Sequence, residues 1–199
     1  MNAALRLSWY KFKHHYMDFV KVLLGIVAFE GLILYIQDKG FLKDFETTRM
    51  TLFLLLFSTS LLIVVQNSIY ISKERSVLNR DFFSGLSRSA FALASMGIHA
   101  FFAVLETIVF ILSYSVFSKF FDKEFPDAGH IFGSYRWEVG ITVLLVFLAS
   151  HFIALFISAL VGKSEITSVI LAVVVGIMQF SLSGTILLSL IHISEPTRH

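Results

Sequence analysis

The sequence predicts an all-α integral membrane protein, a polytopic bundle of apolar helices. Of its 199 residues, 56% are hydrophobic and 15% are charged, and the mean hydropathy is +0.79. A chain of this composition has too little polar surface to cover a water-soluble globule. Its apolar runs reach the length of about 20 residues that a spanning helix needs, and they lack the alternation typical of β-barrel strands. We therefore expect a multi-pass protein of a cell membrane, in contact with the lipid bilayer.

Charge and cysteine content exclude several other classes of protein. The formal net charge is +2 and is spread over the loops, so no basic face is available for a nucleic acid. The chain contains no Cys, which excludes disulfides, thiolate catalysis and Cys-ligated metals. No paired carboxylates, nucleophile with a base, or Gly-rich cofactor turn lies on a polar segment. The sequence thus offers no catalytic, cofactor-binding or metal-binding residues.

The elements follow one another from a basic N-terminus. Residues 1–16 place Leu and aromatic residues among Arg6, Lys11 and Lys13, which suits an amphipathic helix at the cytoplasmic interface. The transmembrane domain then covers residues 17–187, because apolar stretches of spanning length recur along it. Its five predicted spans are residues 17–36, 50–71, 91–117, 137–161 and 166–187.

Loop charges predict the orientation, with the N-terminus in the cytoplasm. Positive residues accumulate in cytoplasmic loops, and here they gather before the first span and between the second and third. The latter loop carries four cations against the acids Glu74 and Asp81; the cations are Lys73, Arg75, Arg80 and Arg88. The loops around residues 38–49 and 119–127 are balanced or acidic and are therefore expected outside.

The loop between the second and third spans, residues 66–91, carries the most specific pattern in the chain. Its members are Gln66, Asn67, Ser68, Glu74, Arg75, Arg80, Asp81, Ser84, Gly85 and Arg88. This pattern resembles the segment that links the second and third membrane helices in ABC exporters of the G-type (pigment and multidrug) class. Asp81 stands where that class prefers Glu, which shortens the carboxylate arm.

The resemblance implies a function and partners. The chain would be the membrane-spanning (permease) domain of an ATP-driven exporter, working with a cytoplasmic ABC ATPase, fused or separate. A second membrane domain would complete the transporter, as in a homodimer, and the ATPase would bind ATP and Mg²⁺. The expected location is a bacterial inner membrane.

Within the resemblance, residues 73–90 form a cytoplasmic coupling segment. The residues expected to meet the ATPase are Glu74, Arg75, Arg80, Asp81 and Phe82. A short helix over residues 76–86 would turn Phe82 towards the bundle, with one face made of Val77, Arg80, Asp81 and Ser84. The alternative is that these charges belong to a solvated loop that only sets the orientation.

The C-terminal residues predict a foreign tail. Residues Leu188 to Arg198 read LSLIHISEPTR, which looks like the translation of an adapter used in transposase-based sequencing libraries. Residues 188–199 are therefore expected not to belong to the natural protein. The G-type class has six spans, so the natural chain would be cut inside its fifth span.

Four polar residues within the spans invite a chemical role. Glu106 lies near the middle of the third span, where an ionised carboxylate must face other helices, a partner subunit or water. Hydrogen bonding between helices is favoured for it over contact with a substrate. Glu30 lies nearer the outer end of its span, where water could reach it. His99 and His151 could form a proton relay or a metal pair, but no third ligand has a suitable spacing.

Gly162, Lys163 and Ser164 mimic the end of a phosphate-binding loop. That loop requires another Gly five residues before Gly162, where Ile157 stands, and it follows a strand instead of a membrane helix. No ATP site is expected in this chain.

Two other classes of protein remain open. A membrane anchor or sensor domain of a multi-domain enzyme would collect polar catalytic residues at one interface. A secondary transporter would show inverted repeats and broken helices. Neither feature is visible, and Pro126 and Pro196, the two prolines of the chain, lie outside the predicted spans.

Overall fold

The structure, a computed structural model, describes residues 10, 13, 16–37, 45–123 and 133–182. These residues form helices and no strands, which confirms the predicted all-α class. In chain order the helices are α2 (Tyr16–Ile36), α3 (Phe45–Asn67), α4 (Arg75–Phe83), α5 (Arg88–Phe120), α6 (Tyr135–Leu160) and α7 (Glu165–Leu182). Most of the expected interface helix and all of the expected foreign tail lie outside the described residues.

Helices α2, α3, α5 and α6 are long and apolar enough to cross a membrane, and they coincide with the first four predicted spans. Helix α7 is apolar and shorter in its described part, and the predicted end of its span at residue 187 lies outside the described residues. The second span differs most, because α3 ends at Asn67 instead of residue 71. Hydropathy predicted a second span that continues past the end of the helix, because Ile69, Tyr70 and Ile71 are apolar but lie in turns.

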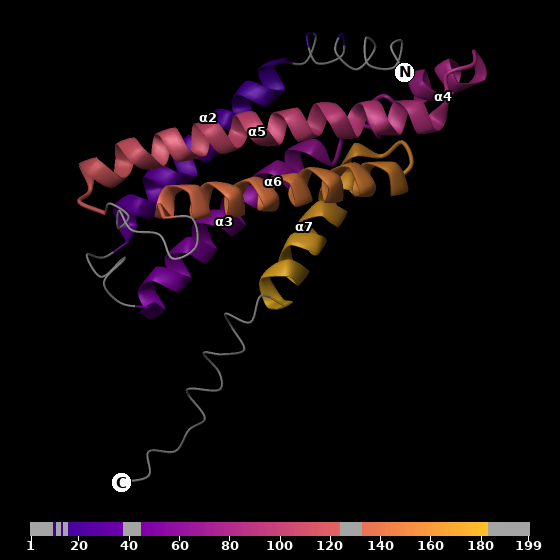
Figure 1. The fold of residues 1–199 in the computed structure, drawn as a ribbon. Helices are drawn as coiled ribbons and strands as arrows, with labels where there is room; N and C mark the ends of the chain where they lie inside the picture. The colour runs from indigo at the N-terminus through magenta and orange to yellow at the C-terminus, as the bar shows by residue number, and fades with distance from the viewer. Residues whose placement is uncertain (1–9, 11–12, 14–15, 38–44, 124–132, 183–199) are drawn as a thin grey trace.

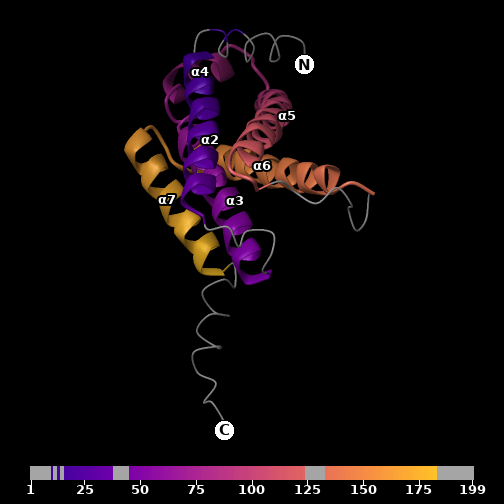
Figure 2. The same ribbon diagram turned by 90° about the vertical axis from the view of Figure 1, so that its left-hand side faces the viewer.

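Helix α3 is central in the bundle. It contacts α2, α6 and α7, while α5 contacts α2 and α6 (Figures 1 and 2). The largest buried cluster joins α2, α3, α5 and α6 through Val22, Ile26, Ile63, Ala103, Phe110, Val143 and Phe147. Helices α3 and α7 approach closely at Gly176, where an added Cβ would lie 2.4 Å from Leu61 Cδ1. Small residues at such contacts are common in membrane bundles because they let the helix backbones approach.

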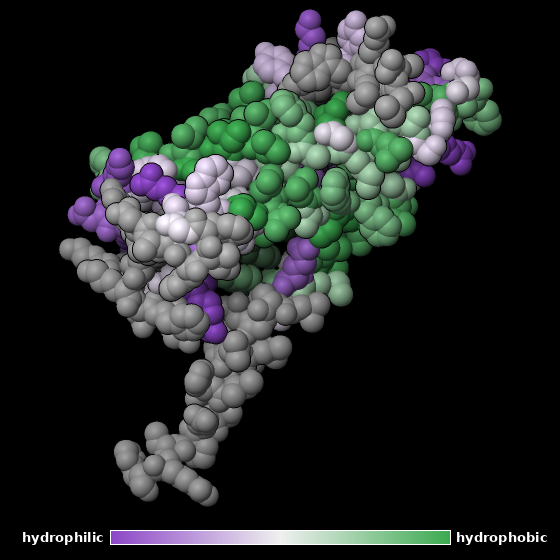
Figure 3. Space-filling view, viewed as in Figure 1, coloured by the Kyte–Doolittle hydropathy of each residue, from purple (hydrophilic) through white to green (hydrophobic). Residues whose placement is uncertain are grey.

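The outside of the bundle is apolar and part of its interior is polar. Figure 3 shows hydrophobic residues along the middle of the visible face and hydrophilic ones near both ends. Leu112 and Leu145, for example, are 62% and 61% exposed, whereas Glu30, Glu106 and His151 are 0% exposed. A water-soluble protein keeps its ionisable groups on the surface, so this reversed pattern suits a bundle surrounded by lipid.

The two ends of the bundle have different contents (Figure 1). The coupling end holds the end of α3, the whole of α4, the start of α5 and the turn between α6 and α7. The opposite end, called the far end here, holds the end of α5 and the start of α6. Helix α5 runs the whole way between the two ends.

Candidate functional site

The turn between α3 and α4, residues 68–74, is hydrogen-bonded to the ends of two helices that come much later in the chain. The hydroxyl oxygen of Ser158, in the last turns of α6, accepts the backbone N–H groups of Ile71 at 2.8 Å and Ser72 at 3.1 Å. The hydroxyl of Ser168, in α7, lies 3.1 Å from that of Ser72 and donates to it. The first two bonds give partners to backbone N–H groups of the turn, which belong to no helix.

Arg75 strengthens this connection. Its Nη1 donates to the carbonyl oxygens of Ala159 at 2.8 Å and Val161 at 3.1 Å. The last carbonyls of an α-helix have no partner within the helix, and a cation there also complements the helix dipole. Arg75, the first residue of α4, therefore caps the end of α6. The predicted coupling residue is turned towards the bundle through this contact.

Helix α4 has one face turned to the bundle. Leu78 is 2% exposed, and the ring of Phe82 packs edge-on against that of Phe91 in α5, with centroids 5.9 Å apart. The guanidinium carbon of Arg88 lies 5.7 Å from the centroid of the Phe82 ring, within the range of a cation–π contact. Phe82 thus holds α4 against the start of α5.

The other face of α4 is open. Arg80 is exposed, Glu74 and Asp81 are half-buried, and Phe83 is 93% exposed. Residues three apart are neighbours on a helix, so Arg80 and Phe83 form a patch that combines a cation with a bare phenyl ring. Sequence reasoning chose Phe82 and missed Phe83. A helical wheel anchored on Leu78 would have separated the two rings.

Helix α4 ends in a Schellman motif. The N–H of Gly85 donates to the carbonyl of Phe82 at 3.2 Å, and that of Leu86 donates to Asp81 at 3.0 Å. Gly85 has φ of +106°, a conformation that residues with a Cβ adopt only at a cost. Ser87 then caps α5 by accepting the N–H of Ala90 at 3.5 Å. The Ser84–Gly85 pair of the sequence pattern therefore sets the angle between α4 and α5.

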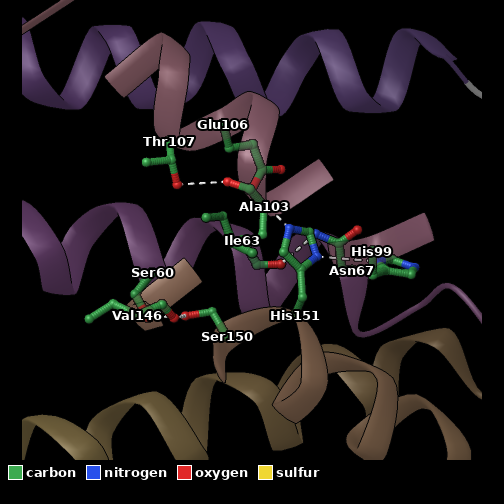
Figure 4. A network of polar contacts seen from close by, with 10 residues as sticks. All are labelled: Ser60, Ile63, Asn67, His99, Ala103, Glu106, Thr107, Val146, Ser150 and His151. Carbon is green, nitrogen blue, oxygen red and sulfur yellow. Dashed lines mark hydrogen bonds and ion pairs between the residues drawn. The ribbon is translucent and has the colours of Figure 1, made fainter. Parts of the chain in front are cut away.

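A second polar site lies inside the bundle, where α5 faces α6 (Figure 4). His99 and Glu106 stand on one face of α5, and His151 projects from α6 between them. The Nδ1 atoms of His99 and His151 are 3.0 Å apart, and His151 Nε2 is 2.8 Å from Glu106 Oε2. All three side chains are at most 1% exposed. We call this chain of three side chains the triad.

The three side chains give one another partners inside the bundle. A polar group buried in hydrocarbon is costly unless it is hydrogen-bonded, and the two contacts of His151 supply a partner for one nitrogen of His99 and for one oxygen of Glu106. His99 Nε2 and Glu106 Oε1 have no hydrogen-bond partner among the described residues.

The triad does not form a metal site. A metal would need lone pairs from several groups directed at one point, but His151 uses its two nitrogens in opposite directions. Within the described part of the chain, no group of three or more ligating side chains could hold a metal ion. The triad can instead fasten α5 to α6 through its two hydrogen bonds. Ser60 and Ser150, whose hydroxyls are 2.7 Å apart, fasten α3 to α6 nearby.

Glu30 differs from expectation. The interpretation that water reaches it is wrong, because its side chain is 0% exposed and its Oε2 accepts a hydrogen bond from Ser113 of α5. Helix α2 packs on α5 along the face that carries Ile26, Glu30 and Ile33. The position of Glu30 near the end of its span did not predict its exposure, because the packing of α2 on α5 decides which face of α2 is exposed to water.

The family model described as ABC-2 type transporter, a membrane-domain model, matches residues 6–191. The chain belongs to the ABC-2 type transporter family. Neither a search of curated proteins nor a search of solved structures found a match. The matched range ends four residues into the expected foreign tail, from Leu188 to Ile191.

Membership in the ABC-2 family assigns a role to the bundle. The chain is a multi-pass permease component of an ABC transporter and is not itself the catalytic part; such permeases typically work with an ABC ATPase. Membership in this family favours the permease of an ABC transporter over the two other classes, a secondary transporter and the membrane anchor of an enzyme. Gly162, Lys163 and Ser164 lie in the turn between α6 and α7, which is not the strand-to-helix setting of a phosphate-binding loop.

Several contacts in this ABC-2 permease had no signal in the sequence. Ser158 and Ser168 lie more than 80 residues from their partners, as their separations of 86 and 96 show. Lys123, expected in a loop outside the membrane, is 6% exposed, and its ammonium donates to the carbonyls of Leu34 and Gln37 at the end of α2. Such pairings depend on which helices are neighbours, and local patterns do not reveal that.

Proposed function

We propose that this ABC-2 permease is the membrane domain of an exporter of the G-type class, driven by a cytoplasmic ATPase that binds ATP and Mg²⁺. The coupling end would face the cytoplasm of a bacterial cell, and a second copy of the chain would complete the transporter. The coupling segment would be residues 73–90. The observation that supports this most is the α4 helix, which is open on one face and on the other contacts the end of α6 through Arg75 and the start of α5 through Phe82.

The proposed mechanism assigns different roles to the two faces of α4. Arg80, Phe83 and the half-buried Asp81 would contact the ATPase, and Glu74 would lie beside this contact. Arg75, together with Ser158 and the Phe82 ring, would carry the displacement into the bundle. Because Arg75 and Ser158 bind at the end of α6, a movement of α4 would shift α6 and α7 along with α3. Rigid helices moving in this way give alternating access.

The test is made on the full-length permease joined to its ATPase in proteoliposomes. Asp81→Ala is expected to leave insertion and folding intact, since such surface carboxylates are worth about 0 to 1 kcal/mol. It should lower both transport and transport-stimulated ATP hydrolysis, whereas Asp81→Glu should keep or raise both. Phe83→Ala should weaken ATPase binding by about tenfold, the effect of losing ~1.4 kcal/mol at an interface hot spot.

The matched control is Phe120→Ala. Phe120 is 82% exposed, close to the 93% of Phe83, but it lies at the far end of the bundle. Its replacement should change neither ATPase binding nor ATP hydrolysis. Normal transport by Asp81→Ala and Phe83→Ala at normal expression would show that the segment is a topological loop and would refute the coupling role.

A further inference from the structure

Two adjoining cavities lie at the far end of the bundle, on either side of the start of α6. The larger, of about 290 Å³, is bounded by α3, α5 and α6, and the smaller, of about 70 Å³, by α5 and α6. They share Phe110, Tyr114 and Val139 as a common wall. We call the two together the far-end cavity. Neither the coupling end nor the triad contributes to it.

The larger part is apolar over most of its depth. Its apolar walls come from Leu52, Leu55, Leu56, Phe110, Val139 and Val143. Its lining residues on α6 run from Tyr135 to Val143, a distance of about 12 Å at the rise of an α-helix. The hydrocarbon of one leaflet is about 15 Å thick, half of the bilayer core. The larger part therefore extends over most of the depth of the layer that an acyl chain occupies.

The mouth of the cavity lies at the level of lipid headgroups. Helix α6 begins with Tyr135 and Trp137, and Trp137 is 69% exposed. Tyr and Trp are enriched where a membrane meets water. Since α5 also ends here, the first turn of α6 lies at the boundary of the hydrocarbon.

Two cations stand at this mouth. Lys119 and Arg136 line the smaller part, are both exposed, and take part in none of the ion pairs found between described residues. Arg presents a fork of donors that matches a phosphate, and Lys supplies a point charge. Glu138 lines the larger part, on the other side of α6. Its carboxylate repels an anion and so favours a position for the anion on the side of Lys119.

We propose that the far-end cavity is a binding site for a glycerophospholipid of the leaflet opposite the coupling end. One acyl chain fills the larger part, and the phosphodiester contacts Lys119 and Arg136. The apolar larger part alone would accept the acyl chain of any lipid. The two cations at the mouth, Lys119 and Arg136, select a lipid whose headgroup carries a phosphate. The site belongs to the membrane-spanning chain itself and holds whether or not the proposed coupling to an ATPase does.

The experiment uses the full chain in vesicles that contain a phospholipid with a photoactivatable group on its acyl chain. After irradiation, mass spectrometry locates the modified residues. We expect adducts on the cavity walls of α3, α5 and α6, and their loss when excess unlabelled phospholipid competes. A photoactivatable diacylglycerol with the same chains, which lacks the phosphate, should label these walls less.

Two variants and two controls separate the parts of the site. Lys119→Gln combined with Arg136→Gln should reduce phospholipid labelling to the diacylglycerol level, whereas Lys163→Gln, an exposed cation at the coupling end, should not. Thr142→Trp, which fills the larger part about two turns from the start of α6, should abolish labelling of the walls. Leu145→Trp, on the outer surface of the same helix, should leave it unchanged.

The wild-type measurements keep the test decisive even where a variant fails to fold. Labelling that unlabelled phospholipid cannot compete away, or that is as strong on the exposed Leu112 and Leu145 as on the cavity walls, would overturn the site. Equal labelling by the diacylglycerol would overturn the assignment of a phosphate ligand. No adduct on the cavity walls at all would also overturn the proposal.

Discussion

At the scale of single residues, the polar groups inside the bundle differ in their hydrogen-bond partners and not in how deeply they are buried. Glu106 and Glu30 are both fully buried, yet Glu106 faces a histidine of α6 and Glu30 faces a serine of α5. A buried polar group that loses its partner costs the free energy of its lost hydration. Each of these contacts is therefore sensitive to the removal of one member and tolerant of the removal of both.

The Glu106–His151 pair allows this to be tested. Glu106→Leu or His151→Leu alone should lower the free energy of unfolding by about 1 to 3 kcal/mol, because each leaves a buried group unsatisfied. The double variant should cost less than the sum of the two, which a double-mutant cycle of thermal or denaturant unfolding in detergent would measure.

The control for the cycle is Thr107→Val. Thr107 is buried beside Glu106, but its hydroxyl donates within its own helix, to Ala103 O at 2.7 Å, so its loss should be small and additive with His151→Leu. Strict additivity of Glu106→Leu and His151→Leu would contradict a hydrogen bond between the two.

At the scale of elements, the connections between helices are as strictly built as the helices themselves. Helix α4 ends at Gly85 because this residue adopts φ of +106°, and α5 begins at once with the Ser87 cap. The angle between α4 and the long α5 depends on this joint. A substitution that loosens this joint should lower the free energy of unfolding while insertion into the membrane is still normal.

Gly85→Ala is expected to destabilise the protein by about 1 to 2 kcal/mol, the cost of a left-handed conformation for a residue with a Cβ. Gly97→Ala is the matched control, since Gly97 lies inside α5, and a Cβ there would meet nothing within 4 Å. It should be neutral or stabilising by up to about 1 kcal/mol because Ala favours a helix. Unfolding of the two variants side by side measures the difference. Equal effects would mean that the joint carries no conformational constraint.

Helix positions were predictable from the sequence, and helix partners were not. Apolar length placed the spans because the bilayer demands it, and it failed at residues 69–71, where apolar side chains lie in turns. The triad needs His99 and His151, which are 52 residues apart, to meet across two helices. Periodicity could place His99 and Glu106 on one face of α5, but only the packing of α6 on α5 brings in His151.

At the scale of the whole molecule, orientation decides which end meets the ATPase. The chain contains no Cys, so single cysteines can be labelled cleanly with a membrane-impermeant maleimide. Cys in place of Lys13 or Arg80 should react only after the cytoplasmic side is opened. Cys in place of Lys43, outside the described residues, or of Asp122, at the far end, should react in intact cells. Labelling of the Arg80 position from outside would reverse the orientation and remove the coupling role with it.

The C-terminal tail gives an independent prediction at the same scale. If the gene is recovered from its source by long-read sequencing, the codons after Leu187 should differ from those for LSLIHISEPTR. Finding that same tail in unamplified genomic DNA would show that it belongs to the natural protein.

The buried Lys123 bears on the order in which the chain can complete its fold during synthesis. Its ammonium satisfies the carbonyls of Leu34 and Gln37, which precede it by 89 and 86 residues. The first span therefore leaves the ribosome with these carbonyls lacking this partner, and the ammonium arrives only after α3, α4 and α5 have been translated. A nascent chain that stalls before residue 123 holds α2 in an unfinished state. Insertion of the first helix and its final anchoring are thus separate events in biogenesis, divided by the synthesis of almost half the protein.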